Sequence, residues 1–298
     1  MKKIAVLMGG TSNERKISLK SGRAVVDALE NTSCRVVPVV LDADSVASVP
    51  RDVDVVFIAL HGGYGENGGI QSDLDRLGIP YTGPGAESSQ LAMDKVATKK
   101  LLKQRQIPTA PWELRKLGDK LSNLVPPVVV KPPREGSSLG ISRVEDTACL
   151  EKAIKAACAA DPCGEALIEK YVPGREWTVS ILGGEALPVV EIIAPGGWYG
   201  FKEKYTRGLT DFAFPDMRRE EALIAVAQCY ALLAYQSLGC RGVSRVDFRV
   251  TDDGDLSILE INTIPGMTST SLLPRAAARA GLNFSDLCLK LIELADCD

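Results

Sequence analysis

A hairpin near the C-terminus brings two carboxylates and an amide together. Asp253-Gly254 lies between two alternating apolar runs and predicts a two-residue turn whose two central residues have positive φ. Counting outward from this turn places Asp247 opposite Glu260, with Asn262 two residues further along the same face. Directly opposed carboxylates repel each other unless a cation lies between them, and oxygen ligands of this kind suit Mg²⁺. The spacing therefore predicts a magnesium site.

The same hairpin has a second interpretation without a metal. Arg245, which falls opposite Asn262, and Arg249 could neutralise the two carboxylates as ordinary cross-strand ion pairs. Because the turn fixes the register but not the ligand, the hairpin alone supports both interpretations equally.

Phosphate-binding groups follow a strand in the middle of the chain. The sequence contains neither a P-loop motif nor a G-x-G-x-x-G motif after the first strand. Lys131 instead ends a strand of valines, and Gly136-Ser137-Ser138 offers backbone N–H groups and hydroxyls just beyond it. A plain surface loop is the simpler interpretation of Gly136-Ser137-Ser138. By the same reasoning, Lys95 could simply face solvent, and Glu169 and Lys170 could form an exposed pair.

Composition excludes several classes of protein. The chain of 298 residues has a formal net charge of −3 and no evident basic patch, which argues against nucleic-acid binding. A single histidine, His61, excludes zinc sites built on paired histidines. Eight cysteines without a C-x-x-C pair, and an N-terminus without a signal peptide, predict reduced thiols in the cytoplasm. The uncharged stretch 222–240 is predicted to be a buried core helix and not a membrane span.

The apolar runs predict an α/β and α+β chain in three parts. Residues 1–85 read as an open parallel α/β unit, with strands at 3–8, 35–41 and 53–60 buried on both faces and a helix at 17–29. Residues 86–176 hold a polar helix through Met93-Asp94-Lys95 and strands at 127–131 and 166–172. Residues 177–298 hold alternating strands, the core helix and the hairpin. His61 begins a glycine-rich loop at the carboxyl edge of the first sheet, where such folds bind ligands.

Taken together, these motifs resemble the ATP-grasp superfamily and, within it, the D-alanine:D-alanine ligase family, over essentially the whole chain. The runs that carry the resemblance are 8–12 with Glu14-Arg15, Leu60-His61-Gly62 with Gly65-Glu66, 92–95, 130–132, 134–138, 168–171, 174–176, Lys204-Tyr205, 245–247 and 259–269.

The resemblance implies a three-domain ATP-grasp architecture, with ATP held between the central and C-terminal domains. It assigns the nucleotide to Lys95, Lys131, Ser137, Ser138, Glu169, Lys170, Val172, Glu176 and Lys204, and two Mg²⁺ (or Mn²⁺) ions to Asp247, Glu260 and Asn262. It assigns substrate to Glu14, His61, Ser271 and Leu272, and catalysis to Glu14, Ser137, Tyr205, Arg245 and Gly266.

The implied reaction joins two D-alanine molecules into D-alanyl-D-alanine for peptidoglycan precursors. The carboxylate of the first D-alanine attacks the γ-phosphoryl group of ATP, and the amine of the second attacks the resulting acyl phosphate. Arg245 and the Gly266 N–H would stabilise the oxyanion, while Lys204 and Tyr205 close over the site and exclude water. D-Alanine and ATP are the expected partners, with no membrane or nucleic acid, and a homodimer is one arrangement open to the chain.

Two positions depart from the family pattern. Phe201 stands where a tyrosine is common in the closing loop, and Thr270 where a histidine is common after Met-Thr-Ser. Both bear on selectivity for the second substrate. Tyr205 favours the dipeptide, and the alternatives are a ligase for D-lactate or D-serine and an inactive ATP-grasp nucleotide-binding protein.

Overall fold

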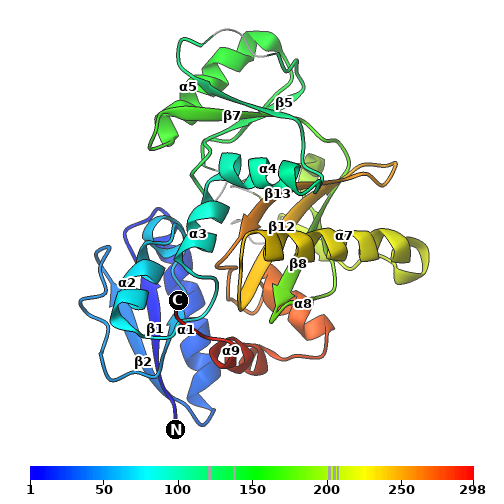
Figure 1. Ribbon diagram of the computed structural model, residues 1–298. Coiled ribbons are helices and arrows are strands. Elements are labelled where there is room, and N and C mark those ends of the chain that lie inside the picture. Colours follow the sequence, from blue (N-terminus) through cyan, green and yellow to red (C-terminus); the bar gives the residue numbers. More distant parts are fainter. Residues whose placement is uncertain (120–122, 137–138, 201–202, 204–205, 207) are drawn as a thin grey trace.

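Three β-sheets follow one another along the molecule (Figure 1). The computed structural model describes residues 1–119, 123–136, 139–200, 203, 206 and 208–298. In Figure 1 the sheet that contains β5 and β7 lies at the top, the sheet of β8, β12 and β13 in the middle, and the sheet of β1 and β2 at the lower left.

The N-terminal sheet is parallel, as predicted, in the order β2-β1-β3. The prediction of two buried faces was wrong for β2, where Val40 is 46% exposed, because β2 is an edge strand of this sheet. The elements of this part are β1 (Lys3–Gly9), α1 (Arg15–Glu30), β2 (Arg35–Leu41), β3 (Val55–Ile58), η1 (Gly63–Gly65) and α2 (Gly69–Leu77).

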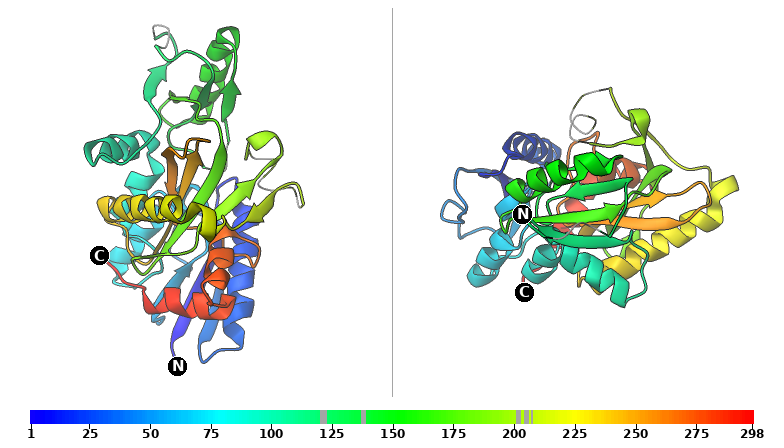
Figure 2. Two further views of the ribbon diagram at one scale, coloured as in Figure 1. Left: turned by 90° about the vertical axis from the view of Figure 1, so that its right-hand side faces the viewer. Right: turned by 90° about the horizontal axis from the view of Figure 1, so that it is seen from above.

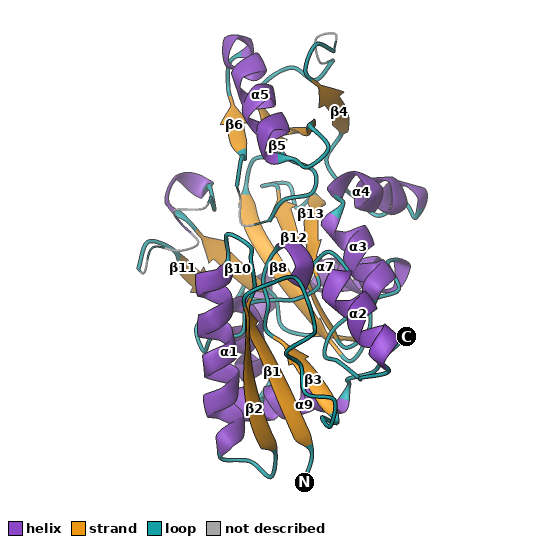
Figure 3. Cartoon of the chain, turned by 90° about the vertical axis from the view of Figure 1, so that its left-hand side faces the viewer, coloured by secondary structure: helices purple, strands orange, loops and turns teal. Residues whose placement is uncertain are grey.

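Helix α1 packs its apolar stripe on β1 (Figure 3). Gly22 permits the close approach, because a Cβ there would lie 2.5 Å from Met8 Cβ. The same core includes Val25 together with Leu273 and Leu287, from the C-terminal helices α8 (Leu272–Arg279) and α9 (Phe284–Glu293). The end of the chain thus returns to complete the core of its beginning.

The second sheet is antiparallel, in the order β4-β7-β5-β6, and α5 covers it. The polar helix expected around Met93-Asp94-Lys95 is broken at Asp94, whose Oδ1 accepts from the N–H groups of Val96 and Ala97, both at 2.9 Å. This cap makes Lys95 the first residue of a new helix. The elements are α3 (Ala86–Met93), α4 (Lys95–Gln104), β4 (Trp112–Lys116), β5 (Val128–Lys131), β6 (Ser142–Val144), η2 (Thr147–Cys149), α5 (Leu150–Ala160) and β7 (Glu165–Lys170).

The third sheet has the order β11-β10-β8-β12-β13, with β9 beside β8. Figure 3 labels β11, β10, β8, β12 and β13, and Figure 2 shows the chain from two further sides. Its strands and helices are β8 (Arg175–Leu182), β9 (Glu185–Ala186), β10 (Val190–Ile193), η3 (Pro195–Gly197), β11 (Asp211–Ala213), α7 (Met217–Ser237), β12 (Val243–Val250) and β13 (Leu256–Asn262).

Helix α7 covers the third sheet with one face only. Ala227 and Ala231 are buried in the core, whereas Val226 and Leu233 are each 42% exposed. The predicted core helix is therefore present, but it is buried on one face only, because the uncharged stretch also places small and apolar residues on the outer face. Among the described residues, no helix combines the length and apolar character needed to cross a membrane.

The hairpin of β12 and β13 has the predicted pairing at its far end and a different turn. Asp247 pairs with Glu260 and Arg245 with Asn262, as predicted. The loop, however, has three residues, Asp252–Gly254, and only Gly254 has positive φ (85°). Leu259 is an extra residue in β13, and this bulge shifts the register by one and restores the predicted pairing.

Candidate active site

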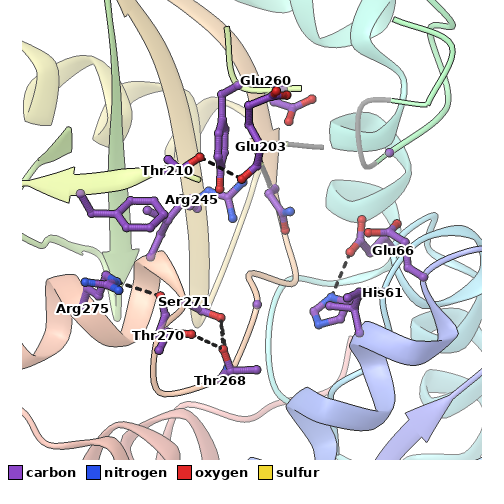
Figure 4. Close-up of a pocket in the computed structure, with 18 of the residues that line it drawn as sticks. His61, Glu66, Glu203, Thr210, Arg245, Glu260, Thr268, Thr270, Ser271 and Arg275 are labelled. Atoms are coloured by element: carbon purple, nitrogen blue, oxygen red, sulfur yellow. Dashed lines mark hydrogen bonds and ion pairs between the residues drawn. The ribbon is translucent and has the colours of Figure 1, made fainter. Parts of the chain in front are cut away.

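A cavity of about 880 Å³ lies where the three sheets meet, and both acidic and basic side chains line it (Figure 4). Figure 4 shows Glu260 and Arg245 on one side, His61 and Glu66 on the other, and below them Ser271 and Thr270, each joined to Thr268 by a hydrogen bond. Nine residues predicted from the sequence line this cavity: Glu14, His61, Lys95, Arg245, Glu260, Asn262, Gly266, Ser271 and Leu272. Ser137, Ser138, Lys204 and Tyr205, together with Phe201, lie outside the described residues.

Asp247 is buried at the carboxylate face of the site. Its Oδ1 accepts from Thr178 Oγ1 at 2.6 Å and from Arg245 Nε at 2.9 Å, and its Oδ2 accepts from an Arg245 guanidinium nitrogen at 2.8 Å. This bidentate pair fixes the guanidinium at the wall of the cavity. Burial opposes the charge of Arg245, but Asp247 outweighs it and raises the pKa of the guanidinium, which stays protonated.

The oxygen donors at this face fit a divalent cation. Three of the lone-pair positions of Asp247 are used, which leaves one on Oδ2. Glu260 is its direct cross-strand neighbour, and Asn262 Oδ1 lies on the same face, where it accepts from the Ile264 N–H at 2.9 Å. In the described part of the chain no group of three or more acidic, histidine or cysteine side chains is arranged so that it could hold a metal ion, so any cation here would rely on this carboxylate pair, the amide and its own ligands.

The alternative of cross-strand ion pairs is correct only in part. Arg245 does neutralise Asp247, but both residues lie on β12. Arg249 turns elsewhere: it donates to Val172 O at 3.1 Å and pairs with Glu176 at 3.5 Å. Val172 and Glu176 are therefore held together by one buried arginine beyond the carboxylate face.

Lys95 joins the carboxylate face to the glycine-rich loop. Its ammonium donates to Glu135 O at 2.7 Å and lies 3.6 Å from Glu260 Oε2. The side chain is buried, so the interpretation of a solvent-facing lysine is wrong; the cap at Asp94 directs the start of α4 into the site.

Lys131 and Glu169 form a buried ion pair, with 2.6 Å between Lys131 Nζ and Glu169 Oε2. Glu169 Oε1 lies 2.6 Å from Nζ of Lys99, a residue that the sequence analysis did not select. The i, i+4 spacing of Lys95 and Lys99 on one helix was the available signal. Glu169 is not an exposed partner of Lys170, which instead donates to Val125 O at 3.2 Å.

Glu14 lies between glycines of two loops, one after β3 and one after β5. A Cβ at Gly62 would lie 2.5 Å from Glu14 Oε2, and one at Gly136 would lie 3.2 Å from it. Gly62 also has a positive φ of 66°, which favours glycine, whereas at Gly136 the contact would only be tight. The loop after β5 is in this way brought onto Glu14 at the substrate side of the cavity.

His61 is part of a buried chain of polar contacts. Its Nε2 lies 2.9 Å from Ser21 Oγ, and its Nδ1 lies 3.4 Å from Glu66 Oε1. Ser21 Oγ also accepts from the Met267 N–H at 3.3 Å. A carboxylate at Nδ1 favours a proton there, so Ser21 donates to Nε2. Ser21 was not selected from the sequence, because a single serine within a helix forms no motif that indicates a functional role.

Ser271 occupies the N-cap position of helix α8 at the cavity, but its side chain turns to Thr268 and makes no capping hydrogen bond. Its Oγ accepts from the Thr268 N–H at 3.1 Å and lies 2.8 Å from Thr268 Oγ1. The first N–H groups of α8, beginning with that of Leu272, are at a helix N-terminus, which favours a carboxylate. Arg275, one turn further, donates to Thr270 O at 2.8 Å.

Tyr199 adds a neutral hydroxyl to the wall beside Arg245. Burial raises the pKa of its phenol to about 12, against the lowering effect of Arg245. At neutral pH the phenol therefore keeps its proton and can donate it to an oxygen in the cavity.

Comparison with known proteins covers nearly the whole chain. A family model described as "D-ala D-ala ligase N-terminus" matches residues 3–47 and 43–84, and one described as "D-ala D-ala ligase C-terminus" matches residues 100–293. A D-alanine–D-alanine ligase of Pelotomaculum thermopropionicum is 44% identical over 309 residues, 98% of this chain and 96% of the relative. One of Citrifermentans bemidjiense is 44% identical, covering 99% and 96%. The crystal structure of the Bacillus anthracis D-alanine–D-alanine ligase complexed with ATP matches with a TM-score of 0.87 at 33% identity, covering 99% and 97%.

Proposed function

The chain belongs to the family of D-alanine–D-alanine ligases, and we propose that it carries out the reaction of that family in the cavity between its three sheets. The protein is an ATP-dependent ligase that forms the peptide bond of D-alanyl-D-alanine. The observation that carries the site assignment is the convergence of nine predicted residues on one cavity. Both alternatives, a different second substrate and an inactive scaffold, become outcomes of the assay below.

We assign the nucleotide to the side of Lys95, Lys131 and Glu169. Both lysines are buried: Lys95 begins α4 and donates to Glu135 O in the glycine-rich loop, and Lys131 ends β5. Positive charges at these places suit the negative charge of phosphates. Lys170 ends β7, Val172 follows it and Glu176 lies in β8; none of the three lines the cavity, and we assign them to the base and ribose. Ser137, Ser138 and Lys204 complete this assignment by resemblance alone.

We assign Mg²⁺ (or Mn²⁺) to Asp247, Glu260 and Asn262. When bound, the metal would neutralise charge on the phosphates as the γ-phosphoryl group is transferred. Arg245 orients Asp247 through their bidentate ion pair, and Lys95 places a positive charge beside Glu260.

The substrate side supplies a partner for each end of the two D-alanine molecules. Glu14 would hold the ammonium of the first D-alanine. The carboxylate of this D-alanine attacks the γ-phosphoryl group, and ADP is released. Ser271 and the N-terminus of α8 would hold the carboxylate of the second, whose amine attacks the acyl carbon and expels phosphate. Arg245 and the Gly266 N–H face the oxyanion of that step.

The three-part division at residues 1–85, 86–176 and 177–298 remains our proposal for the domains. Each sheet falls within one part, except that β8 begins at Arg175, two residues before the third part. We further propose a cytoplasmic location, which the eight free cysteines support. Sedimentation of the purified protein will establish whether it is the homodimer that we allow for.

The decisive experiment is the mass of the product formed from D-alanine, ATP and Mg²⁺. We expect D-alanyl-D-alanine with release of ADP and phosphate, and no turnover with L-alanine. Competition with D-lactate and D-serine in the same tube tests the second-substrate assignment by product mass. Glu260→Ala should abolish turnover and weaken metal-dependent ATP binding; an active variant would contradict the metal assignment.

A further inference from the structure

Three buried charges lie together where α4, β5 and β7 meet. Glu169 is 3% exposed and its two oxygens are divided between Lys131 and Lys99, each at 2.6 Å. Lys131 is 5% exposed and Lys99 is 1% exposed. Burial lowers the pKa of Lys99, against the raising effect of the adjacent Glu169. When both lysines are protonated, the cluster contains two cations and one anion, and it is short of one negative charge in a region where water cannot screen the imbalance.

The ammonium of Lys99 makes three close polar contacts. It donates to Thr109 Oγ1 at 2.6 Å and to Ala110 O at 3.3 Å, and it lies 2.6 Å from Glu169 Oε1 as an ion pair. These contacts fix its position, whereas Lys131 has one strong contact among the described residues. Lys99 is therefore the permanent partner of Glu169, and Lys131 is the cation with protons to spare.

Thr109 connects this cluster to the strand that carries the carboxylates. Its hydroxyl has one proton, which it donates to Ile258 O at 2.9 Å, so it must accept from Lys99. Backbone pairing strengthens the link, because the Ile258 N–H donates to Pro108 O at 2.9 Å. Ile258 lies on β13, two residues before Glu260. Lys99 thus ties the second sheet to the metal-binding end of the third.

We propose that Lys99 is a positioning residue for ATP: it holds Glu169 so that Lys131 is aligned but incompletely neutralised, and it fixes this lysine relative to β13 through Thr109. This rests on the proposed function, because the missing negative charge is the one that an ATP phosphate would supply. Without Lys99, Glu169 and Lys131 would form a neutral pair, and Lys131 would attract a phosphate less strongly.

The test compares Lys99→Met with Lys100→Met, which removes an exposed lysine from the adjacent position of the same helix. Steady-state kinetics give KM for ATP and for D-alanine separately, and thermal unfolding reports stability. We expect Lys99→Met to raise KM for ATP at least tenfold while KM for D-alanine stays within twofold, and Lys100→Met to change neither. The wild-type protein in the same assay tests the ligase activity independently.

Thr109→Val provides a second variant that keeps both ion pairs and removes only the hydroxyl, which accepts from Lys99 and donates to Ile258 O. We expect a threefold to tenfold rise in KM for ATP, again without a change for D-alanine. The proposal is overturned if Lys99→Met melts at a lower temperature with unchanged KM for ATP, or if both KM values rise together. It is equally overturned if Lys99→Met does not fold and Thr109→Val binds ATP like the wild type.

Discussion

Replacing Ser21 by alanine should slow catalysis without removing any group that touches substrate. The Ser21 hydroxyl is fully buried, accepts from the Met267 N–H at 3.3 Å and donates to His61 Nε2 at 2.9 Å. Met267 directly follows Gly266, whose N–H we place at the oxyanion. One hydroxyl from α1 therefore positions both the histidine of the substrate side and the loop of the oxyanion hole.

The expected loss can be divided into stability and rate. Ser21→Ala leaves a buried N–H without its acceptor, which costs about 1–3 kcal/mol of folding free energy. Loss of one oxyanion-hole donor typically lowers kcat by about 10²–10³, and here the donor is displaced and not removed. We therefore expect kcat to fall by roughly tenfold to a hundredfold, with KM for ATP unchanged because the nucleotide side is untouched.

Ser18→Ala is the matched control. Ser18 lies one turn earlier on α1, is equally buried, accepts from the Gly9 N–H at 2.8 Å and donates to Ala59 O at 2.7 Å, but contacts neither His61 nor Met267. Thermal unfolding should show similar losses for both variants, while the coupled ADP-release assay should show a reduced kcat for Ser21→Ala alone. Equal kcat values for the two variants would refute the positioning role.

Three further outcomes follow from single contacts. Gly62 has φ 66° and ψ 168°, a conformation that costs other residues about 1–3 kcal/mol, and a Cβ there would contact Glu14. Because Glu14 lies on the substrate side, Gly62→Ala should raise KM for D-alanine and leave KM for ATP unchanged. Burial raises the pKa of the Cys288 thiol to about 12, so a thiol reagent at pH 8 should label exposed Cys229 in the native protein and Cys288 only after unfolding. Burial opposes the charge of Glu169, but its two lysines outweigh burial and lower its pKa. The carboxylate therefore stabilises the fold fully above its unfolded pKa, and this stabilisation is lost as the pH falls through its folded pKa. The difference in unfolding free energy between wild type and Glu169→Gln, measured by denaturant titration, should therefore shrink below about pH 4.5, and a constant difference would contradict the ion cluster.

The hairpin shows why sequence reasoning succeeded at the metal-binding residues. Asp253-Gly254 predicted a two-residue turn, but the loop has three residues and only Gly254 has positive φ. The bulge at Leu259 adds one residue to the opposite strand, so the two deviations cancel before Asp247 and Glu260 are reached. Alternation of buried and exposed residues constrains the pairing at the site more strongly than turn chemistry does.

Buried polar contacts between distant segments could not be predicted. Lys99 appears in the sequence as one lysine of a polar helix, and Ser21 as a serine among charged residues. Their partners, Glu169 and Met267, are brought to them only by packing of separate elements. Residue types reveal which groups can react, whereas the groups that hold them in place depend on tertiary structure.

The site depends on a few side chains that cross from one sheet to another. Ser21 links the first part of the chain to the Gly266 loop, Lys95 links α4 to Glu260, and Thr109 links the segment before β4 to β13. Phosphoryl transfer followed by amine attack needs two substrates and ATP in one geometry, and small errors of placement are costly in rate. Since each link is a single hydrogen bond or ion pair, changes at the links should alter kcat or KM for one substrate while the assigned ligands stay intact. The division of KM effects between ATP and D-alanine then reports which sheet has moved.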